Sequence, residues 1–289
     1  MRTLISAAGL VALGLIAGCG GNGTTAQTAP VSGVVADGYL NKAEVFLDMN
    51  NNYKWDAGEP KTTSGSGGAY TLMAPTADAV RYPVVARAIA GTTIDEDTDS
   101  AVSAGYVMSA PAGAAGFVSP MSTLIREKME ANPGMTLDIA MTQLRIQLNM
   151  PAGINMMGDY VAGSQGGTNA AGYQAMRVTA QQMAGLAAGQ EALVMNGGSA
   201  NVNRYRSMMG TINTNMPSIS ANAMNGLDMN SSFMTGMRNQ MQSQLATMPM
   251  SGGFMNFSGM FRNMTSHQQF RNYSGGRMQH GSGMMKKNL

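Results

Sequence analysis

Residues 31–48, VSGVVADGYLNKAEVFLD, contain two β-rich runs separated by the turn dipeptide Asp37-Gly38. Further runs rich in β-branched and aromatic residues follow at 69–73, AYTLM, and at 82–90, YPVVARAIA. Short strands at regular spacing, with turn residues between them, are typical of a small β-sandwich. The runs at 106–108 and 116–118 are expected to add strands at its edges. The sequence therefore predicts a sandwich over residues 31–118.

The pattern changes from strand to helix at residue 119. Ser119 suits a helix N-cap and Pro120 suits the first turn, so a helix is expected to begin there. Thr136 opens a second apolar-periodic run that ends before Pro151, and a third runs from about residue 169 to 193. We therefore expect an α+β fold, in which a helical domain at 119–195 follows the sandwich.

Residues 196–289 differ in composition from the rest of the chain. Of the 30 methionines, 16 lie between Met208 and Met285, among Asn, Ser, Gly and Gln. Such a segment has little branched apolar surface to bury, so part of it is expected to be disordered. Met234, Met237 and Met241 nevertheless fall at helical spacing, which predicts a soft amphipathic stripe.

The N-terminal 19 residues have the pattern of an export signal. Arg2 is followed by an apolar core at 4–17 that is short for a membrane span. Residues 16–19, IAGC, resemble a bacterial lipobox, which implies that Cys19 receives a diacylglycerol group. Because Cys19 is the only cysteine, an internal disulfide and a thiolate metal cluster are excluded. Residues 20–30, GGNGTTAQTAP, are expected to be a flexible tether.

The loop after the second β-rich run carries oxygen-bearing side chains at alternate positions. In residues 48–59, DMNNNYKWDAGE, loop positions 1, 3, 5, 7, 9 and 12 have the spacing of a calcium-binding loop with a backbone carbonyl at position 7. Tyr53 stands at position 6, where glycine is usual, so we expect weak binding, with a Kd of about 10⁻⁴ to 10⁻³ M. The alternative is a loop whose amides cap their own backbone. The predicted calcium ligands are Asp48, Asn50, Asn52, Lys54, Asp56 and Glu59.

These residues also carry a family resemblance. Residues 31–72, with GVVADGYLNKAEVFLDMNNN, WDAGEP and GAYTL, resemble the prealbumin-like β-sandwich domains of bacterial surface proteins. That group includes carboxypeptidase-regulatory-like domains and the calcium-binding B repeats of adhesins. The resemblance implies that a calcium ion stiffens the module and takes no part in chemistry. Residues 90–124 resemble the continuation found in many exported bacterial lipoproteins, and Gly20 after Cys19 resembles the sorting pattern for the outer membrane.

Charge and motifs limit the classes of function. Residues 20–175 hold 14 acidic and 8 basic residues, whereas residues 176–289 hold 2 acidic and 9 basic ones. The near-neutral total predicts no specific nucleic-acid partner. The sequence has no G-x-S-x-G, H-E-x-x-H or phosphate-binding G-x-x-x-x-G-K-[ST] pattern, and both histidines lie near the C-terminus. We therefore expect a protein that is not an enzyme. An acidic run at 95–99, DEDTD, is interpreted as a solvated turn, with a second ion site as the alternative.

A second function class is suggested by the methionines. Thioethers bind Cu(I) and Ag(I) in preference to hard ions, and an imidazole stands among them near the C-terminus. The candidate soft-metal residues are Met248, Met250, Met278, His280, Met284 and Met285. The first hypothesis is thus a lipoprotein of the cell outer membrane, on its periplasmic face or at the cell surface, anchored through lipid, stiffened by calcium and attached to a surface protein or polysaccharide. The alternative is an envelope protein that binds copper or silver through residues 196–289.

Overall fold

The computed structural model describes residues 27–196, 199–250 and 255–261. The chain has an α+β fold, with the sheets in the N-terminal half and the helices after them, as expected. The first half contains the strands β1 (Thr28–Val35), β2 (Leu40–Asn41), β3 (Glu44–Leu47), β4 (Lys61–Thr63), β5 (Ala69–Pro75), β6 (Val84–Ala88), β7 (Ile94–Asp95), β8 (Ser100–Ala101), β9 (Tyr106–Ala110) and β10 (Phe117–Val118).

Two sheets form the sandwich, and a small third sheet lies beside them. The strand orders are β10-β1-β5, β4-β3-β6-β9 and β2-β7-β8. β1 pairs antiparallel with β5 from Thr28 to Val34, and parallel with β10 at Val34 and Val35. Both β9 and β10 lie at sheet edges, so this prediction is confirmed.

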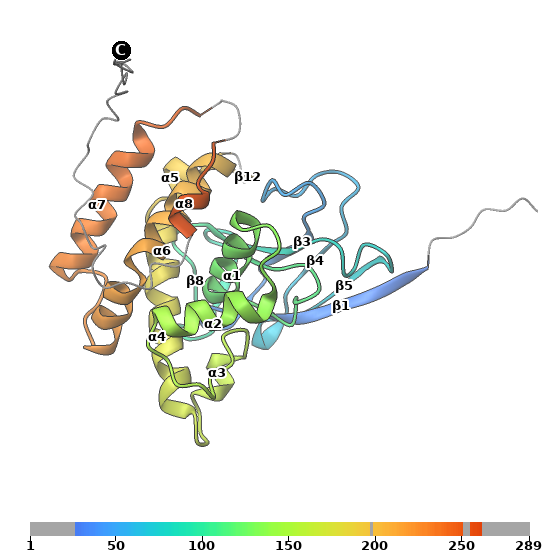
Figure 1. Cartoon of the computed structure of the whole chain (residues 1–289). Coiled ribbons are helices and arrows are strands. Elements are labelled where there is room, and N and C mark those ends of the chain that lie inside the picture. Colours follow the sequence, from blue (N-terminus) through green and yellow to red (C-terminus); the bar gives the residue numbers. More distant parts are fainter. Residues whose placement is uncertain (1–26, 197–198, 251–254, 262–289) are drawn as a thin grey trace, which may run out of the picture.

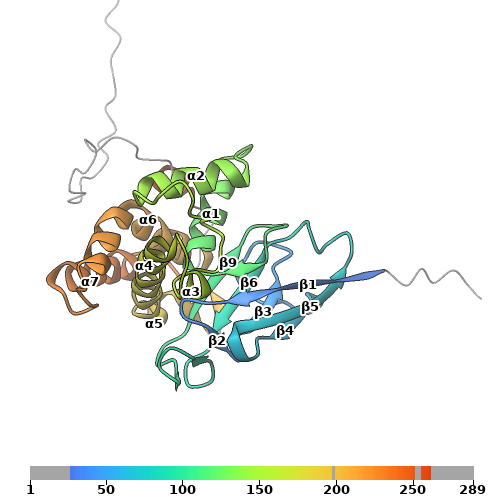
Figure 2. The ribbon, with the colours of Figure 1, turned by 90° about the horizontal axis from the view of Figure 1, so that it is seen from below.

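Burial shows how the layers are stacked. Side chains of β5 alternate between exposed and buried, since one face of its sheet meets water. Every residue of β9 is buried, because the four-stranded sheet has the other sheet on one face and helices on the other. Figure 2 shows the helices grouped on one side of β6 and β9, with β1 and β5 on the other.

The helical half contains α1 (Pro120–Ala131), α2 (Leu137–Gln147), α3 (Tyr160–Gly163), α4 (Ala170–Ala188), α5 (Glu191–Val194), α6 (Val202–Met224), α7 (Ser232–Ala246) and α8 (Ser258–Phe261), with a hairpin of β11 (Met195–Asn196) and β12 (Ser199–Ala200) before α6. Ser119 caps α1, as predicted, in a capping box with Ser122. The second helix begins after Thr136, as predicted, and Thr136 caps it. The Ser122 hydroxyl also donates to the carbonyl of Ser109 at 2.6 Å, which fastens α1 to β9.

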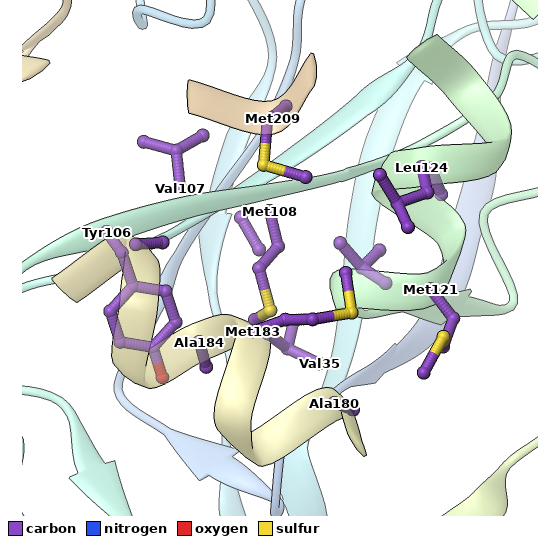
Figure 3. Packing of buried hydrophobic residues seen from close by; sticks show 14 of the residues in the cluster. Val35, Tyr106, Val107, Met108, Met121, Leu124, Ala180, Met183, Ala184 and Met209 are labelled. Atoms are coloured by element: carbon purple, nitrogen blue, oxygen red, sulfur yellow. The ribbon is translucent and has the colours of Figure 1, made fainter. Parts of the chain in front are cut away.

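Methionine side chains fill the space between the sandwich and the helices. Figure 3 shows Met108 of β9, Met121 of α1, Met183 of α4 and Met209 of α6 packed together. Met is suited to this position because its flexible thioether fills irregular gaps. A cavity of only about 10 Å³ remains between β9, α1, α4 and α6.

The methionine-rich segment contributes to the same core. α6 packs against α4, and α7 packs against α6, so helices on both sides of the expected boundary at residue 195 belong to one layer. Met234, Met237 and Met241 face inward with exposures of 0%, 5% and 1%. The predicted helical stripe is therefore confirmed, and it is a buried one.

Candidate calcium loop and the buried charge cluster beneath it

The candidate loop connects β3 to β4 at one end of the four-stranded sheet. Its base is closed by a hydrogen bond from the Leu47 amide to the carbonyl of Pro60 at 3.1 Å. The Asp48 amide donates to the carbonyl of Pro83 at 3.0 Å, so the first loop residue is also held to the segment before β6. The loop therefore begins and ends at fixed points of the sandwich.

Asp48, the first predicted ligand, is fully buried. Its Oδ1 accepts a hydrogen bond from the Asn52 amide at 2.9 Å, and its Oδ2 accepts from the Tyr53 amide at 3.2 Å. Oδ2 also accepts from the Arg126 guanidinium at 3.0 Å. Asp48 thus organises the loop from inside, while its charge is balanced by a helix residue 78 positions away.

Asn50, Asn52 and Asp56 meet on the outer side of the loop. Asp56 Oδ2 accepts from the amide nitrogens of Asn50 and Asn52 at 2.9 and 2.6 Å. These hydrogen bonds lower the pKa of the Asp56 carboxyl. Lys54 Nζ lies 3.4 Å from Asp56 Oδ1, and its side chain is half exposed. The structure therefore brings positions 3, 5 and 9 together, with a cation beside them.

Glu59, the last predicted ligand, closes the loop from the other end. Its Oε1 accepts from the Met49 amide at 2.7 Å and its Oε2 accepts from the Asp56 amide at 3.0 Å. Burial raises the pKa of the Glu59 carboxyl, although these two hydrogen bonds act in the opposite direction. The carboxylate spans loop positions 2 and 9 and fixes the curvature of the loop.

The loop residues fit a calcium ion in their donor types and only in part in their orientation. Asp48, Asp56 and Glu59 supply carboxylates, and half a turn of each Asn50 and Asn52 amide would direct its oxygen to the place now taken by nitrogen. Asp48 Oδ1 accepts one hydrogen bond, from the Asn52 amide, within the described ranges, so it retains acceptor capacity. In the described part of the chain, no group of three or more His, Cys, Asp or Glu side chains is arranged to hold a metal ion.

Tyr53 occupies loop position 6, and its contacts account for a large side chain where glycine is usual. Its backbone has φ of 58°, the left-handed conformation that glycine adopts more readily. Its ring is buried, with the Tyr205 ring at 4.4 Å and the Arg126 guanidinium carbon 4.3 Å from its centre. Its hydroxyl donates to the carboxylate of Glu127. Tyr53 therefore anchors the loop to the helices, and this anchoring offsets the backbone strain.

A cluster of charged side chains lies beneath the loop, between α1 and α6. Arg126 Nε lies 2.7 Å from Glu130, and Arg206 pairs with both Glu127 and Glu130. Burial raises the pKa of the Glu127 carboxyl, and the neighbouring Glu130 raises it further, against the effect of Arg206 and Arg126. We define the buried charge cluster as Asp48, Tyr53, Arg126 and Glu127, which are buried, together with Glu130 and Arg206 at its partly exposed edge.

The helix residues of this cluster were not predicted from the sequence. Arg126, Glu127 and Lys128 are all buried, because α1 is covered on several sides by β9, α2, α4, α6 and α8. Within the described residues, Lys128 Nζ has no hydrogen-bond partner, and burial lowers its pKa to about 8. The run of three charged residues between Ile125 and Met129 is the feature of the sequence that could have drawn attention to this cluster.

The acidic turn at 95–99 is attached to the helices. The Asp97 carboxylate lies 2.6 Å from the guanidinium of Arg177 and accepts from Gln181 at 2.8 Å, both in α4. Nearby, Asp37 accepts from the Tyr106 hydroxyl at 2.6 Å. Burial, aided by the charges of Asp95 and Asp97, raises the pKa of Asp37 to about 7 against the effect of that hydrogen bond.

The remaining predicted site residues lie mostly outside the described ranges. Met248 is half-buried and Met250 is 49% exposed, and their carbonyls accept hydrogen bonds from Arg204 and Asn201. The soft-metal hypothesis stays a prediction. The residues outside the described ranges are Cys19, Met278, His280, Met284 and Met285.

Comparisons with other proteins do not assign this site. Family models, curated protein sequences and solved structures gave no match to the chain. Among the residues that the structure describes, none of the helices has the length and apolar character needed to cross a membrane.

Proposed function

We propose that this chain is a non-enzymatic lipoprotein of the bacterial cell envelope, anchored through Cys19, in which the 48–59 loop binds calcium. The module that calcium stiffens then serves a structural or attachment role toward a surface protein or polysaccharide. The observation that supports this proposal best is the closed form of the loop, in which Glu59 joins the amides of Met49 and Asp56. A loop held at both ends keeps its ligand side chains together before an ion arrives, which lowers the cost of binding.

The ligand set follows from the side chains that meet in the loop. Asp48, Asn50, Asn52, Asp56 and Glu59 would supply side-chain oxygens, and Lys54 would supply its carbonyl. A calcium ion bound there contributes positive charge at the end of the sandwich and replaces the hydrogen bonds between Asp56 and the two amides. Its proposed role is mechanical, as the resemblance to calcium-stiffened sandwich domains implies.

Three features support weak affinity. Lys54 and Arg126 place positive charges 3.4 and 3.0 Å from ligand carboxylates. The third is Tyr53, whose left-handed backbone is strained. We expect a Kd of about 10⁻⁴ to 10⁻³ M, the range in which extracellular modules bind calcium.

Two experiments test the two parts of the proposal. Calorimetric titration of calcium into the full chain should show binding in the stated range, and Glu59→Gln should abolish it, whereas Glu44→Gln, a change in the adjacent strand β3, should leave it unchanged. Labelling of growing cells with radioactive palmitate should mark the protein, and Cys19→Ser should remove the label. Absence of calcium binding by the full chain contradicts the first part, and absence of label on the unchanged chain contradicts the second.

A further inference from the structure

The end of the sandwich from which the tether emerges carries exposed apolar side chains. Val80 is 70% exposed and Met73 is 54% exposed, the former in the turn after β5 and the latter opposite Pro30 on the outer face of the sheet. Both lie at the end where β1 begins, which Figures 1 and 2 place away from the helices. We call Pro30, Met73, Val80, Arg81 and Tyr82 the tether-end patch.

Val80 and Pro30 adjoin each other beside the start of β1. The Thr76 amide and hydroxyl both donate to the carbonyl of Gln27, at 2.8 Å each, so the turn that carries Val80 is fastened to the residue before β1. Between β1, this turn and residues 113–116 lies a groove of about 350 Å³, lined largely by small apolar residues: Ala29, Pro30, Val31, Ala79, Val80 and Ala115. The apolar surface and the entry of the chain thus share one end of the fold.

The side chains next to the apolar ones suit a membrane surface. The Arg81 guanidinium lies over the Tyr82 ring, 5.2 Å from its centre. Tyr pairs an apolar ring with a polar hydroxyl, and Arg binds phosphate groups through several donors, so both are favoured at the level of lipid head groups. Among the residues that the structure describes, β1 has no partner strand on one side from Thr28 to Gly33, which permits contact at the surface and disfavours deep insertion of its backbone.

The short chain between Cys19 and the first strand would keep the patch close to the lipid surface. Seven residues, 20–26, lie between Cys19 and Gln27, so eight Cα-to-Cα steps join the two. Fully extended, these steps reach at most about 28 Å, at about 3.5 Å per step. A short flexible linker gives an effective concentration in the millimolar range, so a patch with weak affinity for lipid is occupied once the anchor is in place.

We propose that the tether-end patch lies against the lipid surface, so that the helical layer is held away from the bilayer in a fixed orientation. This inference rests on the proposed lipidation of Cys19. The same anchor without patch contact would leave the fold free to rotate about residues 20–26.

The test uses the full lipidated chain in phosphatidylcholine vesicles that contain phosphatidylglycerol. Because the lipid occupies the only cysteine, Val80→Cys supplies one free thiol for a fluorescent label. Met224→Cys, at the end of α6, is the matched control, since Met224 is 62% exposed. Brominated phosphatidylcholine should quench the label at position 80 several-fold more strongly than the label at position 224.

A second variant separates contact from mere proximity. A label is attached through Thr76→Cys in two chains, one with the native patch and one that also carries Met73→Asp and Val80→Asp. The two aspartates add charge at exposed positions and leave the core intact. Quenching at position 76 should be strong with the native patch and should fall to the level of position 224 with the two aspartates, while the protein stays with the vesicles.

Four outcomes overturn the inference. Equal quenching at positions 80 and 224 means that the fold has no preferred orientation. Quenching at position 76 that survives the two aspartates means that the tether alone brings it near the lipid. A blue shift of the label at position 80 without quenching means that a second copy of the chain covers the patch. A chain that carries no lipid on Cys19 and stays in the aqueous phase overturns the proposed anchoring as well, which distinguishes that failure from the other three.

Discussion

Arg126 connects the candidate calcium loop to the helices, and its replacement by methionine tests that connection. Its guanidinium donates to Asp48 at 3.0 Å and to Asn51 at 3.1 Å, and it lies on the ring of Tyr53. Methionine fills much of the same space with apolar atoms, so Arg126→Met chiefly removes the charge. Of the donors in the described part of the chain, Asp48, which has no exposed surface, then keeps the two backbone amides of Asn52 and Tyr53.

The cost follows from the separation and burial of the pair. Two unit charges about 4 Å apart attract each other by about 4 kcal/mol at an effective dielectric constant of about 20. Removal of one partner of a buried ion pair costs about 3–5 kcal/mol, because the other charge stays buried without compensation. We therefore expect Arg126→Met to lower the free energy of unfolding by about 4 kcal/mol, which corresponds to a fall in Tm of about 8–16 °C.

Urea unfolding of the full chain, followed by far-ultraviolet circular dichroism, measures this loss. Lys61→Met is the control, because Lys61 pairs with Glu44 at 3.2 Å while remaining 36% exposed, and its loss should cost about 1 kcal/mol. The double variant Asp48→Asn with Arg126→Met should lose less than the sum of the two single changes, by about 2 kcal/mol.

If Arg126→Met lowered the free energy of unfolding by no more than Lys61→Met does, Arg126 would not stabilise the buried Asp48 as inferred. Strict additivity of Asp48→Asn and Arg126→Met would refute that inference too, since independent effects would mean that the two charges do not stabilise each other across the boundary between loop and helix.

Three further predictions concern buried groups. The pKa of Asp37 is raised from 3.8 to about 7, so the folded chain binds a proton at Asp37 more tightly than the unfolded chain does. The free energy of unfolding should therefore fall as pH rises from about 4 to about 7. Asp37→Asn should remove this slope from a plot of Tm against pH. The pKa of Lys128 is lowered from 10.5 to about 8, so the free energy of unfolding should rise as pH increases from about 8 to 10.5. In urea titrations at pH 7, Lys128→Met should raise the free energy of unfolding by about 1–3 kcal/mol. A decrease would show that the amine has a favourable partner. Met237→Ala should cost about 2–5 kcal/mol by the same measurement and the exposed Met224→Ala under about 0.5 kcal/mol; equal small losses would mean that α7 does not share the core.

Local signals in the sequence were sufficient for much of the fold. Ser119 and Thr136 cap α1 and α2 because their hydroxyls accept from the amide three residues later, and that requires no knowledge of distant contacts. The strands near Asp37 and the edge strands β9 and β10 were predicted for similar reasons. The convergence of Asn50, Asn52 and Asp56 follows from spacing within one loop.

The buried charge cluster depends on tertiary contacts, and spacing could not reveal it. Arg126 and Asp48 are 78 residues apart, so only the packing of α1 under the loop brings them together. Tyr53 was interpreted as a defect at a glycine position, because its ring contact with Tyr205 joins segments far apart in the sequence. The burial of Lys128 was hidden for the same reason, since helical periodicity shows one covered face and α1 has several.

The dependence of Tm on calcium is the most direct test of the central claim that calcium stiffens the sandwich. For a Kd of about 10⁻⁴ to 10⁻³ M, about 10 mM calcium should stabilise the full chain by about 1.4–2.7 kcal/mol, or about 3–10 °C in Tm relative to a chelator. Glu59→Gln should abolish the shift. An unchanged Tm in calcium and in chelator would contradict the account.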